Sequence, residues 1–376
     1  MDGQKPKSLV EHFSSITDPR IDRTKRHKLI DILVIAVCAT ICGAETWEEF
    51  ELFGKAKLNW FKTFLELPNA IPSHDTFRRV LSRIDPRQFQ QCFLDWVRSA
   101  FELTQGQVVA IDGKKSRRSY DLRAGKSAIN MVSAWARESQ IVLGQVKVDD
   151  KSNEIPAIPQ LIDMLELAGC IVTIDAMGCQ TEIAAKITEK KADYVLSVKG
   201  NQGNLYEDLV AYFDWALEDK FKLTQFTTDE TADGEHGRIE VRRYYVTDDI
   251  DWLRNKSEWK AIKSIAMVER ERTVNGEETS LERSYYISSL SAEAKRIGRC
   301  IRGHWSIENS LHWVLDIAFS EDNSRIRKDH GPENMATLRH IALNLLKANK
   351  SVKVGVKSKR KNAGWNESYL LEVLYT

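Results

Sequence analysis

Between residues 106 and 200 the sequence alternates short apolar runs with amphipathic segments, and this alternation restricts the fold more than any other feature. Five runs have the length and composition of buried strands, at 107–112, 128–136, 141–148, 170–175 and 194–199. Helical periodicity is clearest in the intervening segments 155–168 and 181–190. Strands that alternate with helices indicate an α/β layer structure.

Two of the apolar runs end in an aspartate, Asp112 in the first and Asp175 in the fourth. In α/β sheets, sites form where the strands end, so we expect these two side chains to meet at one edge of the sheet. Either aspartate alone would be commonplace after a strand. Because there are two of them, we looked for a further carboxylate elsewhere in the chain that could share a site with them.

A third acid, Glu308, lies in segment 291–327, whose front half has the pattern of a helix with Ser291 as its N-cap. Apolar residues recur there at near-helical spacing and form a stripe that we expect to be buried: Ile297, Ile301, Trp305, Leu311, Val314 and Leu315. A carboxylate on such a helix needs a partner, because an unpaired buried charge is costly. Arg302 can supply a salt bridge, and a metal ion is the alternative.

If Asp112, Asp175 and Glu308 converge, their charges repel one another unless cations neutralise them. Mg²⁺ suits such a site because it accepts one or two carboxylates while it keeps water and phosphate oxygens as ligands. Two such ions about 4 Å apart can hold the attacking and leaving oxygens of a phosphoryl transfer. The three carboxylates therefore predict a two-metal site.

Two other assignments of the carboxylates stay open. His304, Glu308 and His312 are spaced by four residues, so on one helix they would stack one turn apart and could bind Zn²⁺. That site would leave the two strand-end aspartates unexplained. The third carboxylate can also be chosen from the acids that follow in the chain: Asp316, Glu321 and Asp322.

The segments outside this core have different patterns. Residues 1–105 look all-helical, and segment 73–85, which carries Arg78 and Arg79, suits the second helix of a helix-turn-helix or an ordinary basic surface helix. Residues 201–290 mix a helix with strands at 238–247, 260–270 and 283–289. The tail from 347 to 376 is basic and poorly patterned, and we expect it to be partly disordered until it binds an anion.

The net charge gives no indication of a nucleic-acid partner, because 55 Lys and Arg face 54 Asp and Glu in 376 residues. Their distribution does, since bases cluster at 20–28, 114–126 and 347–361 and such clusters can create a phosphate-binding field. The apolar run 32–42 is too short to span a bilayer, so we expect no membrane segment. The six cysteines form no CxxC motif and follow no secretory signal, which indicates reduced thiols in a cytosolic protein.

Several segments resemble the DDE transposases of bacterial insertion sequences, and specifically their H-repeat-associated subgroup. The matching segments include AIDGKKSRRSY, TIDAMGCQTEIAAKI, YVLSVKGNQGNL, HGRIEVRR and IRGHWSIENSLHWVLDIAFSEDNSRIR. The helical part resembles the domain that precedes the catalytic core in this subgroup, through HKLIDILVIAVCATICGAETWEEFELFG and IPSHDTFRRVLSRI. The resemblance extends over residues 8–375, and motifs of this length and order are highly specific.

The resemblance implies a ribonuclease H-like catalytic core formed by 106–200 and 291–346. A helical domain at 1–105 would precede it and bind the DNA ends, a β-rich insertion would occupy 201–290, and a basic tail 347–376. In this family Asp112, Asp175 and Glu308 would be the catalytic residues and would bind two Mg²⁺ ions, for which Mn²⁺ can substitute.

The resemblance also implies what the protein acts on and where. Its partners would be double-stranded DNA, both the terminal repeats of the element and the target, and a second copy of the chain when it is bound to DNA. The reaction would be strand cleavage at the ends followed by strand transfer, in the cytoplasm of a bacterium at the nucleoid. A catalytically decayed DNA-binding protein and a metal nuclease without strand transfer are the alternatives.

Related transposases carry a Tyr-x2-Arg-x3-Glu-x6-Lys signature around the glutamate, and this chain has Ile301, His304 and Leu315 at its other three positions. The metal-binding residues are unaffected by this departure, but the contacts with the DNA end must differ. We expect DNA contacts from basic and polar residues near the site, in the insertion and in the helical domain: Lys114, Lys115, Arg117, Arg118, Lys199, Gln202, His236, Arg238, Arg302, His304, Arg78 and Arg79.

Overall fold

The computed structural model describes residues 9–121, 125–150, 152–235, 238–274 and 277–376, and the chain in it divides into two units. The first unit comprises Met1–Glu102, Gly113–Ser152 and Glu308–Thr376, and the second comprises Leu103–Asp112 and Asn153–Ile307. Apart from the passage between Glu102 and Leu103, the chain changes unit after Asp112, after Ser152 and after Ile307. Neither unit is therefore a contiguous piece of the sequence.

The second unit is built on a mixed sheet with the strand order β1-β4-β5-β9-β8-β7-β6. Its strands are β1 (Val108–Lys115, whose residues from Gly113 on belong to the first unit), β4 (Ile171–Ile174), β5 (Asp193–Val198), β6 (Thr227–Glu235), β7 (Arg238–Thr247), β8 (Ser264–Val274) and β9 (Glu277–Ser288). β1, β4 and β5 pair in parallel, while β9, β8, β7 and β6 follow in antiparallel order. The parallel part positions the predicted aspartates.

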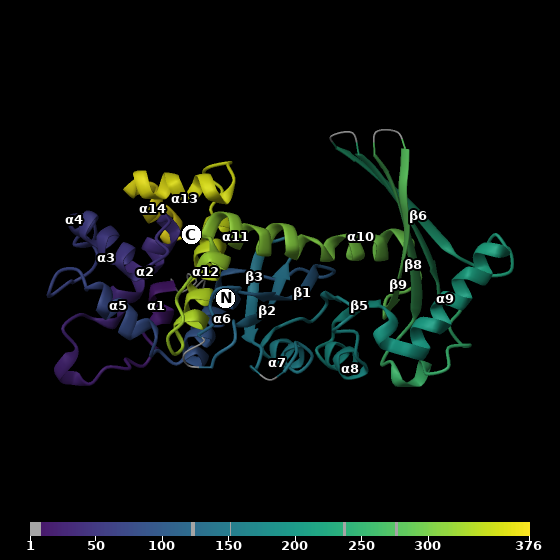
Figure 1. Cartoon of the computed structure of the whole chain (residues 1–376), viewed down its shortest axis with the longest axis horizontal. Coiled ribbons are helices and arrows are strands. Elements are labelled where there is room, and N and C mark those ends of the chain that lie inside the picture. Colours follow the sequence, from purple (N-terminus) through teal and green to yellow (C-terminus); the bar gives the residue numbers. More distant parts are fainter. Residues whose placement is uncertain (1–8, 122–124, 151, 236–237, 275–276) are drawn as a thin grey trace, which may run out of the picture. The chain divides into compact units, whose positions relative to one another are not determined.

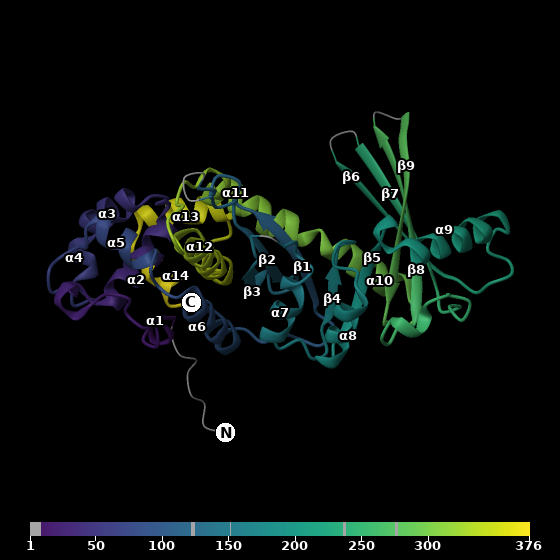
Figure 2. The same ribbon diagram turned by 60° about the horizontal axis from the view of Figure 1, so that its bottom comes forward.

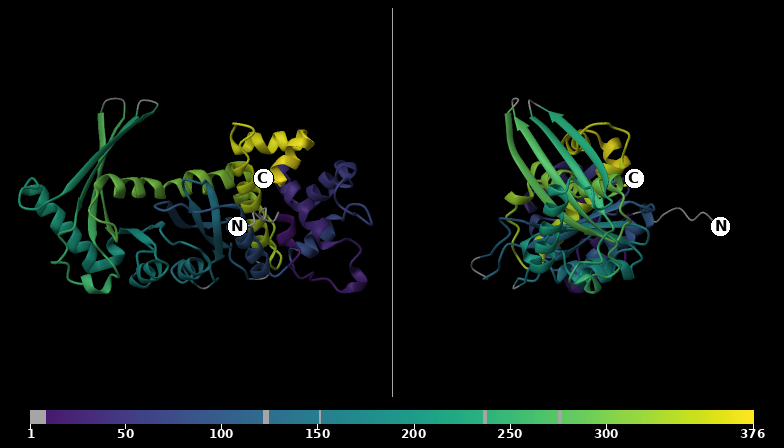
Figure 3. Two further views of the ribbon diagram at one scale, coloured as in Figure 1. Left: turned by 180° about the vertical axis from the view of Figure 1, so that it is seen from behind. Right: turned by 90° about the vertical axis from the view of Figure 1, so that its right-hand side faces the viewer.

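Helices cover both faces of this sheet. They are α7 (Ala157–Met164), α8 (Thr181–Glu189), α9 (Gly203–Glu218) and α10 (Ala294–His304), with short 3-10 helices at Gly200–Gln202 and Lys256–Glu258. α10 lies on one face of β4 and β5, and α7 and α8 lie on the other (Figure 1). α9 packs against β9 in the antiparallel part of the sheet (Figure 3).

The expected strands and helices of this unit are confirmed, with two differences. β1 does not end at Asp112 but continues to Lys115, although its last residues are Gly and Lys rather than apolar. β6 was not expected, because the sequence TTDETADGE has no apolar alternation. It forms a strand because it pairs along its whole length with β7, from Thr227 opposite Val246 to Glu235 opposite Arg238.

The first unit combines helices from both ends of the chain with a two-stranded antiparallel hairpin. Its elements are α1 (Leu9–Phe13), α2 (Leu29–Cys42), α3 (Trp47–Ala56), α4 (Leu58–Phe61), α5 (His74–Leu81), α6 (Pro86–Ala100), β2 (Asn130–Ala136), β3 (Ile141–Lys147), α11 (Trp313–Phe319), α12 (Gly331–Ala348), α13 (Val356–Trp365) and α14 (Glu367–Leu374). Shorter helices lie at Asp22–Thr24, Glu308–His312 and Glu321–Asn323. α12 is the central helix and contacts α2, α5, α6, α13, α14 and β3 (Figure 2).

The described part of residues 1–105 is helical, as predicted, and the local signals act as expected. Gly43 ends α2 in the left-handed region with φ 110°, and Thr46 and Glu49 form a capping box at the start of α3. A separate N-terminal domain stays a prediction, since these helices pack within the first unit against α12. In the described residues no single helix is long and apolar enough to cross a membrane, while α2 and α3 meet that test together as a pair bent by 96°.

The expectation of a partly disordered C-terminal tail is wrong, because residues after 347 form α13 and α14. Two of their bases are buried and donate to backbone carbonyls: Lys359 Nζ to Leu346 and Asn349, and Arg360 to Thr40 and Ile41 at the end of α2. The last carbonyls of a helix have no partner within that helix, so a buried guanidinium can satisfy them. Basic residues here stabilise the fold.

The helix predicted in the front half of segment 291–327 is confirmed in part. α10 begins after Glu293 rather than Ser291 and ends at His304, a π-helix covers Glu308–His312, and α11 follows. Trp305, expected to be buried, is 53% exposed. The α-helical spacing that placed it on the apolar stripe does not continue through the turn at Trp305 and the wider π-helical turn.

Candidate active site

Asp112 and Asp175 belong to the second unit, and each directly follows a residue of two paired strands. Their preceding residues, Ile111 and Ile174, are direct partners in the parallel pairing of β1 with β4. Neighbouring strands are about 4.8 Å apart and aligned residues point to the same face, so the two carboxylates share one face at adjacent positions. Both residues are half-buried. The predicted meeting of the two strand-end aspartates is thus supported by the strand register.

α10 covers the face of the sheet to which these aspartates belong. Side chains of a strand alternate between faces, so Asp112 shares a face with Val108, and Asp175 with Ile171. Val108 and Ile171 form one apolar core with Ile297 and Ile301 of α10. The helix therefore lies over the same face as the two carboxylates, and its apolar residues determine how it is seated.

His304, the last residue of α10, contacts the strand that leads to Asp175. Its Nδ1 is 3.1 Å from the hydroxyl oxygen of Thr173, which lies two residues before Asp175 and therefore on the same face. This hydrogen bond ties the end of α10 to the candidate site. The expected DNA contact of His304 stays a prediction, and a position beside the carboxylates is compatible with it.

The loop after β4 holds Asp175 in a defined orientation. Its Oδ1 accepts hydrogen bonds from the backbone N–H of Met177 at 3.1 Å and of Gly178 at 3.3 Å. A Cβ atom on Gly178 would collide with the side chain of Ile174, so only glycine allows this tight return. Backbone donors stabilise the ionised carboxylate.

Two residues of the segment after β5 brace the same loop from outside. Asn201 donates through Nδ2 to the carbonyl of Ala176 at 2.8 Å, and Gln202 donates through Nε2 to the carbonyl of Cys179. Burial and the nearby charge of Asp175 raise the pKa of the Cys179 thiol, which is therefore neutral rather than nucleophilic. The described contacts of Gln202 are structural, and its predicted contact with DNA is not tested by them.

These residues suit a hard divalent cation. Two carboxylates at adjacent positions on one sheet face present oxygen ligands, which Mg²⁺ and Mn²⁺ prefer. In the described residues Asp175 has no ion pair with a Lys or Arg, and both of its backbone hydrogen bonds go to Oδ1. The donor set is thus consistent with a metal site.

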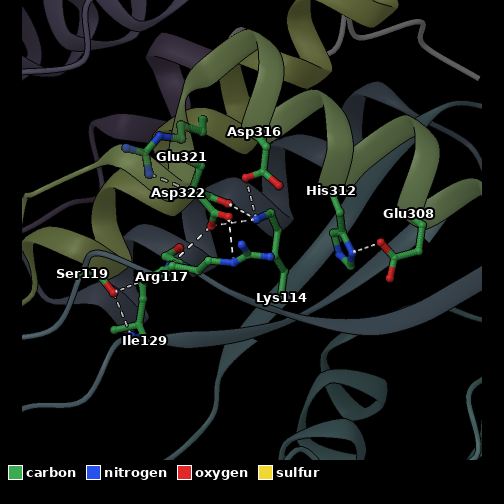
Figure 4. Close-up of polar contacts among 11 residues, drawn as sticks. Lys114, Arg117, Ser119, Ile129, Glu308, His312, Asp316, Glu321 and Asp322 are labelled. Carbon is green, nitrogen blue, oxygen red and sulfur yellow. Dashed lines mark hydrogen bonds and ion pairs between the residues drawn. The ribbon is translucent and has the colours of Figure 1, made fainter.

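Glu308 begins the π-helix in the first unit, and its side chain is half exposed. Its Oε2 lies 3.4 Å from Nδ1 of the buried His312, so the spacing of four residues does bring these two side chains together (Figure 4). π-helical turns are rare and frequently mark functional sites. The predicted stacking of His304 on the same α-helix fails, because α10 ends at His304, and the helical Zn²⁺ site loses its basis.

The other acids considered as a third metal ligand gather around Lys114 (Figure 4). Lys114 Nζ lies 2.7 Å from Asp316, 3.4 Å from Asp322 and 3.7 Å from Glu321. Glu321 also pairs with Arg339 of α12 at 3.4 Å, and Asp322 with Nε of Arg117 at 3.1 Å. We call these six residues the Lys114 network, and in it every carboxylate has a cationic partner.

Two groups in and beside this network have shifted pKa values. Burial alone would lower the pKa of Lys114, but the charges of Glu321, Asp316 and Asp322 outweigh it and raise that pKa. Burial, together with the positive charges nearby, lowers the pKa of His340 to about 3. Lys114 is therefore charged and His340 neutral near pH 7.

The remaining residues expected to contact DNA have varied surroundings. Lys115, Arg118 and Lys199 are exposed, and the side chain of Arg117 is 80% exposed beside Asp322. Arg302 pairs with Asp233, and Arg78 and Arg79 pair with Asp75 on the outer face of α5. His236 lies outside the described residues, and Arg238 is described only as the first residue of β7. Their DNA contacts stay predictions.

Three residues that shape these surroundings were not predicted. Thr173 could have been found, because it is a polar residue on a buried strand two positions before Asp175. Gly178 and Arg339 carry weaker signals: one glycine in a loop and one base in a long apolar helix. Their roles depend on contacts between segments that are distant in the sequence.

Comparison with known proteins is consistent with this description. Residues 94–345 match the family described as Transposase DDE domain, and residues 10–97 match the family described as DDE_Tnp_1-associated. "Putative transposase YncI" of Escherichia coli O157:H7 is 44% identical over 370 residues, which cover 98% of this chain and 94% of that protein. "H repeat-associated putative transposase YhhI" of Escherichia coli K12 is 41% identical and covers 98% of both chains. A piggyBac transposase synaptic complex with hairpin DNA aligns with 98% of this chain and 77% of its own at 12% identity, with a TM-score of 0.40.

Proposed function

The chain belongs to the DDE transposase family, and from this premise we propose that it cuts DNA at the ends of an insertion element and joins those ends to target DNA in a metal-dependent reaction. The observation that supports this proposal is the register of β1 and β4, in which Ile111 and Ile174, the residues directly before Asp112 and Asp175, are partners. Two carboxylates so placed on rigid strands suit the binding of a catalytic cation.

The proposed catalytic core is ribonuclease H-like. β1, β4 and β5 are parallel, and the hairpin β2-β3 continues the strand order on the other side of β1 as β3-β2-β1. α7 leads into β4 and α8 connects β4 with β5, as in an α/β sheet, and β6 to β9 form the β-rich insertion before α10. Metal ligands at strand ends suit such a core, because the sheet holds them rigidly.

In the proposed site Asp112, Asp175 and Glu308 hold two Mg²⁺ ions, for which Mn²⁺ can substitute. Bound ions would lower the pKa of the attacking water and neutralise charge on the transferred phosphate. The role of the protein is to hold the three carboxylates in place, and the backbone N–H groups of Met177 and Gly178 do so for Asp175. Little else is needed from side chains, since phosphoryl transfer depends mainly on positioning and charge neutralisation.

Double-stranded DNA is the proposed partner, both as the terminal repeats of the element and as target. The exposed bases Lys115, Arg118 and Lys199 are close in sequence to the two strand ends and can contact phosphates. Arg78 and Arg79 on α5 can contribute to end recognition. We further propose that two copies assemble on DNA, because two element ends must be joined, and that the reaction takes place on nucleoid DNA in the bacterial cytoplasm.

The decisive experiment is incubation of the full chain with Mg²⁺ and DNA that carries the native element ends, with products mapped to the nucleotide. Cleavage at the element boundary and joining to a target plasmid are the expected results. End binding without cleavage would identify a catalytically decayed DNA-binding protein. Cleavage without joined products would identify a metal nuclease.

A further inference from the structure

Lys114 was expected to bind phosphate, but its side chain is committed to the protein. It is 10% exposed, and its Nζ lies within 4 Å of Asp316, Asp322 and Glu321 (Figure 4). Its ammonium donates hydrogen bonds to Asp316 and Asp322, and Glu321 at 3.7 Å adds a third negative charge. A phosphate would have to displace at least one of them.

The Lys114 network connects four elements of the first unit. Lys114 comes from the end of β1, Asp316 from α11, Glu321 and Asp322 from the turn after α11, and Arg339 from α12. With Arg117, it has three cations and three carboxylates, so it needs no external ion for charge balance. The buried members Lys114, Glu321 and Arg339 connect β1, the turn after α11 and α12, and the ion pair of Lys114 with Asp316 holds α11 to the end of β1.

α11 is continuous with the π-helix that starts at Glu308, so what fixes α11 also fixes Glu308. α11 begins at Trp313, immediately after the π-helix Glu308–His312, and Asp316 follows Glu308 by eight residues. Helical hydrogen bonds transmit a rotation at Asp316 to Glu308. A π-turn is uncommon in isolation, so its direction depends on how the following helix is held.

We propose that Lys114 is a positioning residue for Glu308: its contact with Asp316 sets the rotation of α11 and thereby the direction of the Glu308 carboxylate. This inference rests on the proposed function, in which Glu308 is a metal ligand. Lys114 lies two residues after Asp112 on β1, so the same ion pair connects the strand of one metal ligand with the helix of another.

The competing assignment gives the opposite result when Lys114 is removed. If Asp316, Glu321 and Asp322 were the metal ligands, Lys114 would compete with the cation, and its removal would strengthen metal binding. If Lys114 positions Glu308, its removal weakens metal binding, because α11 is no longer held. The direction of the change separates the two.

The test is Mn²⁺ binding to the full-length, metal-free protein, measured by electron paramagnetic resonance, for wild type and Lys114→Met. Methionine keeps the length of the side chain but removes its charge. Changes in groups that orient metal ligands typically cost about 10- to 100-fold in metal affinity, and we expect a loss in this range. Lys55→Met, which removes an exposed lysine paired with Glu51 on α3, is the control and should bind Mn²⁺ like wild type.

Unchanged or tighter Mn²⁺ binding by folded Lys114→Met overturns the proposal. If that variant does not fold, the double variant Lys114→Met/Asp316→Asn removes one charge of each sign and leaves the pairs Glu321–Arg339 and Asp322–Arg117 intact. Weaker binding of the wild-type number of ions supports the positioning role. Wild-type affinity, or the loss of one ion, contradicts it.

A wrong assignment of the metal site would be recognised by a different result in the same Mn²⁺ binding measurement. Asp175 is outside the network, and if Asp175→Asn binds Mn²⁺ like wild type, the metal site itself is wrongly assigned, whatever Lys114 does. A reduced affinity of Asp175→Asn together with wild-type affinity of Lys114→Met would reject only the positioning role.

Discussion

The negative charges of Asp175 and of the carboxylates in the Lys114 network are stabilised in different ways. Asp175 is held by two backbone N–H groups and, in the described residues, has no ion pair with a Lys or Arg. Asp316, Glu321 and Asp322 each have a cation of the protein within 4 Å. A carboxylate that is oriented by neutral donors keeps its charge available to a bound cation, whereas one that is paired internally does not.

Proximity of acids to one another is not a sufficient criterion for choosing metal ligands in this chain. Three carboxylates lie within 4 Å of Lys114, and all three were plausible metal ligands by sequence. Their partners identify them as part of the folded scaffold. The sheet face with Asp112 and Asp175 has fewer acids but is the better candidate for the metal site.

The largest effect should come from Asp175→Asn. It removes the charge that would bind the cation but keeps the backbone hydrogen bonds to the side-chain oxygen, so we expect cleavage at element ends to fall by about 10³-fold or more. Cleavage rates at saturating DNA measure this, and end binding in a gel-shift assay should be unchanged. Cleavage within tenfold of wild type would remove Asp175 from the site.

Glu321→Gln should instead affect stability. Glu321 is 3% exposed and contacts both Lys114 and Arg339, so the loss of its charge leaves buried cations without compensation and should cost about 3 kcal/mol. Urea unfolding measures it. Glu367→Gln, which breaks an exposed pair with Lys57, is the control and should change stability by less than about 1 kcal/mol. Equal effects would mean that the network is not an internal scaffold.

The pH dependence of stability should reflect His340, beside the network. Its pKa is about 3 in the folded chain and about 6.5 when unfolded, so the unfolded chain binds the extra proton between these values. Stability is complete above pH 6.5 and falls as the pH decreases toward 3, by about 2 kcal/mol from this residue at pH 5.

Urea unfolding of wild type and His340→Met at pH 7 and pH 5 measures this contribution. The variant has no imidazole to protonate, so its loss of stability between the two pH values should be smaller by about 2 kcal/mol. The same pH dependence in both proteins would show that His340 is not the responsible group.

The smallest effect is expected for Gln202, where the test distinguishes support of the loop after β4 from contact with DNA. Gln202→Ala removes one hydrogen bond to the loop and should reduce stability by about 1 kcal/mol. Lys199→Ala is the matched variant: it should leave stability unchanged but reduce the salt dependence of DNA binding by about one phosphate contact. If Gln202→Ala weakens DNA binding at unchanged stability, its role is the one predicted from sequence.

Much of the fold and part of the site follow from sequence, because they depend on local patterns. Apolar runs predict β4 and β5, and the aspartate after β4 is found where expected. The helix caps at Gly43 and Thr46 depend on neighbouring residues, so they can also be predicted from the sequence. Features of this kind need no knowledge of distant segments.

Other features could not be predicted because a distant partner decides them. β6 is a strand only because β7 pairs with it, and the π-helix at Glu308 interrupts the α-helical spacing before α11. The contact of Lys114 with Asp316, about 200 residues later, could not be predicted either. The sequence alone does not indicate whether a charged side chain pairs with a ligand or with another residue of the protein.

The bond from Arg360 to the end of α2 has a consequence for biosynthesis. Arg360 donates to the carbonyl of Thr40, which precedes it by 320 residues. At about 5–20 residues per second, a ribosome needs roughly 15 to 65 seconds to make the intervening chain. During that time the end of this buried helix lacks its final donor, so a nascent or prematurely terminated chain would expose apolar surface to chaperones and proteases. Copies of the gene truncated near their 3′ end should accordingly yield little folded protein, even when every codon for the proposed metal ligands is intact.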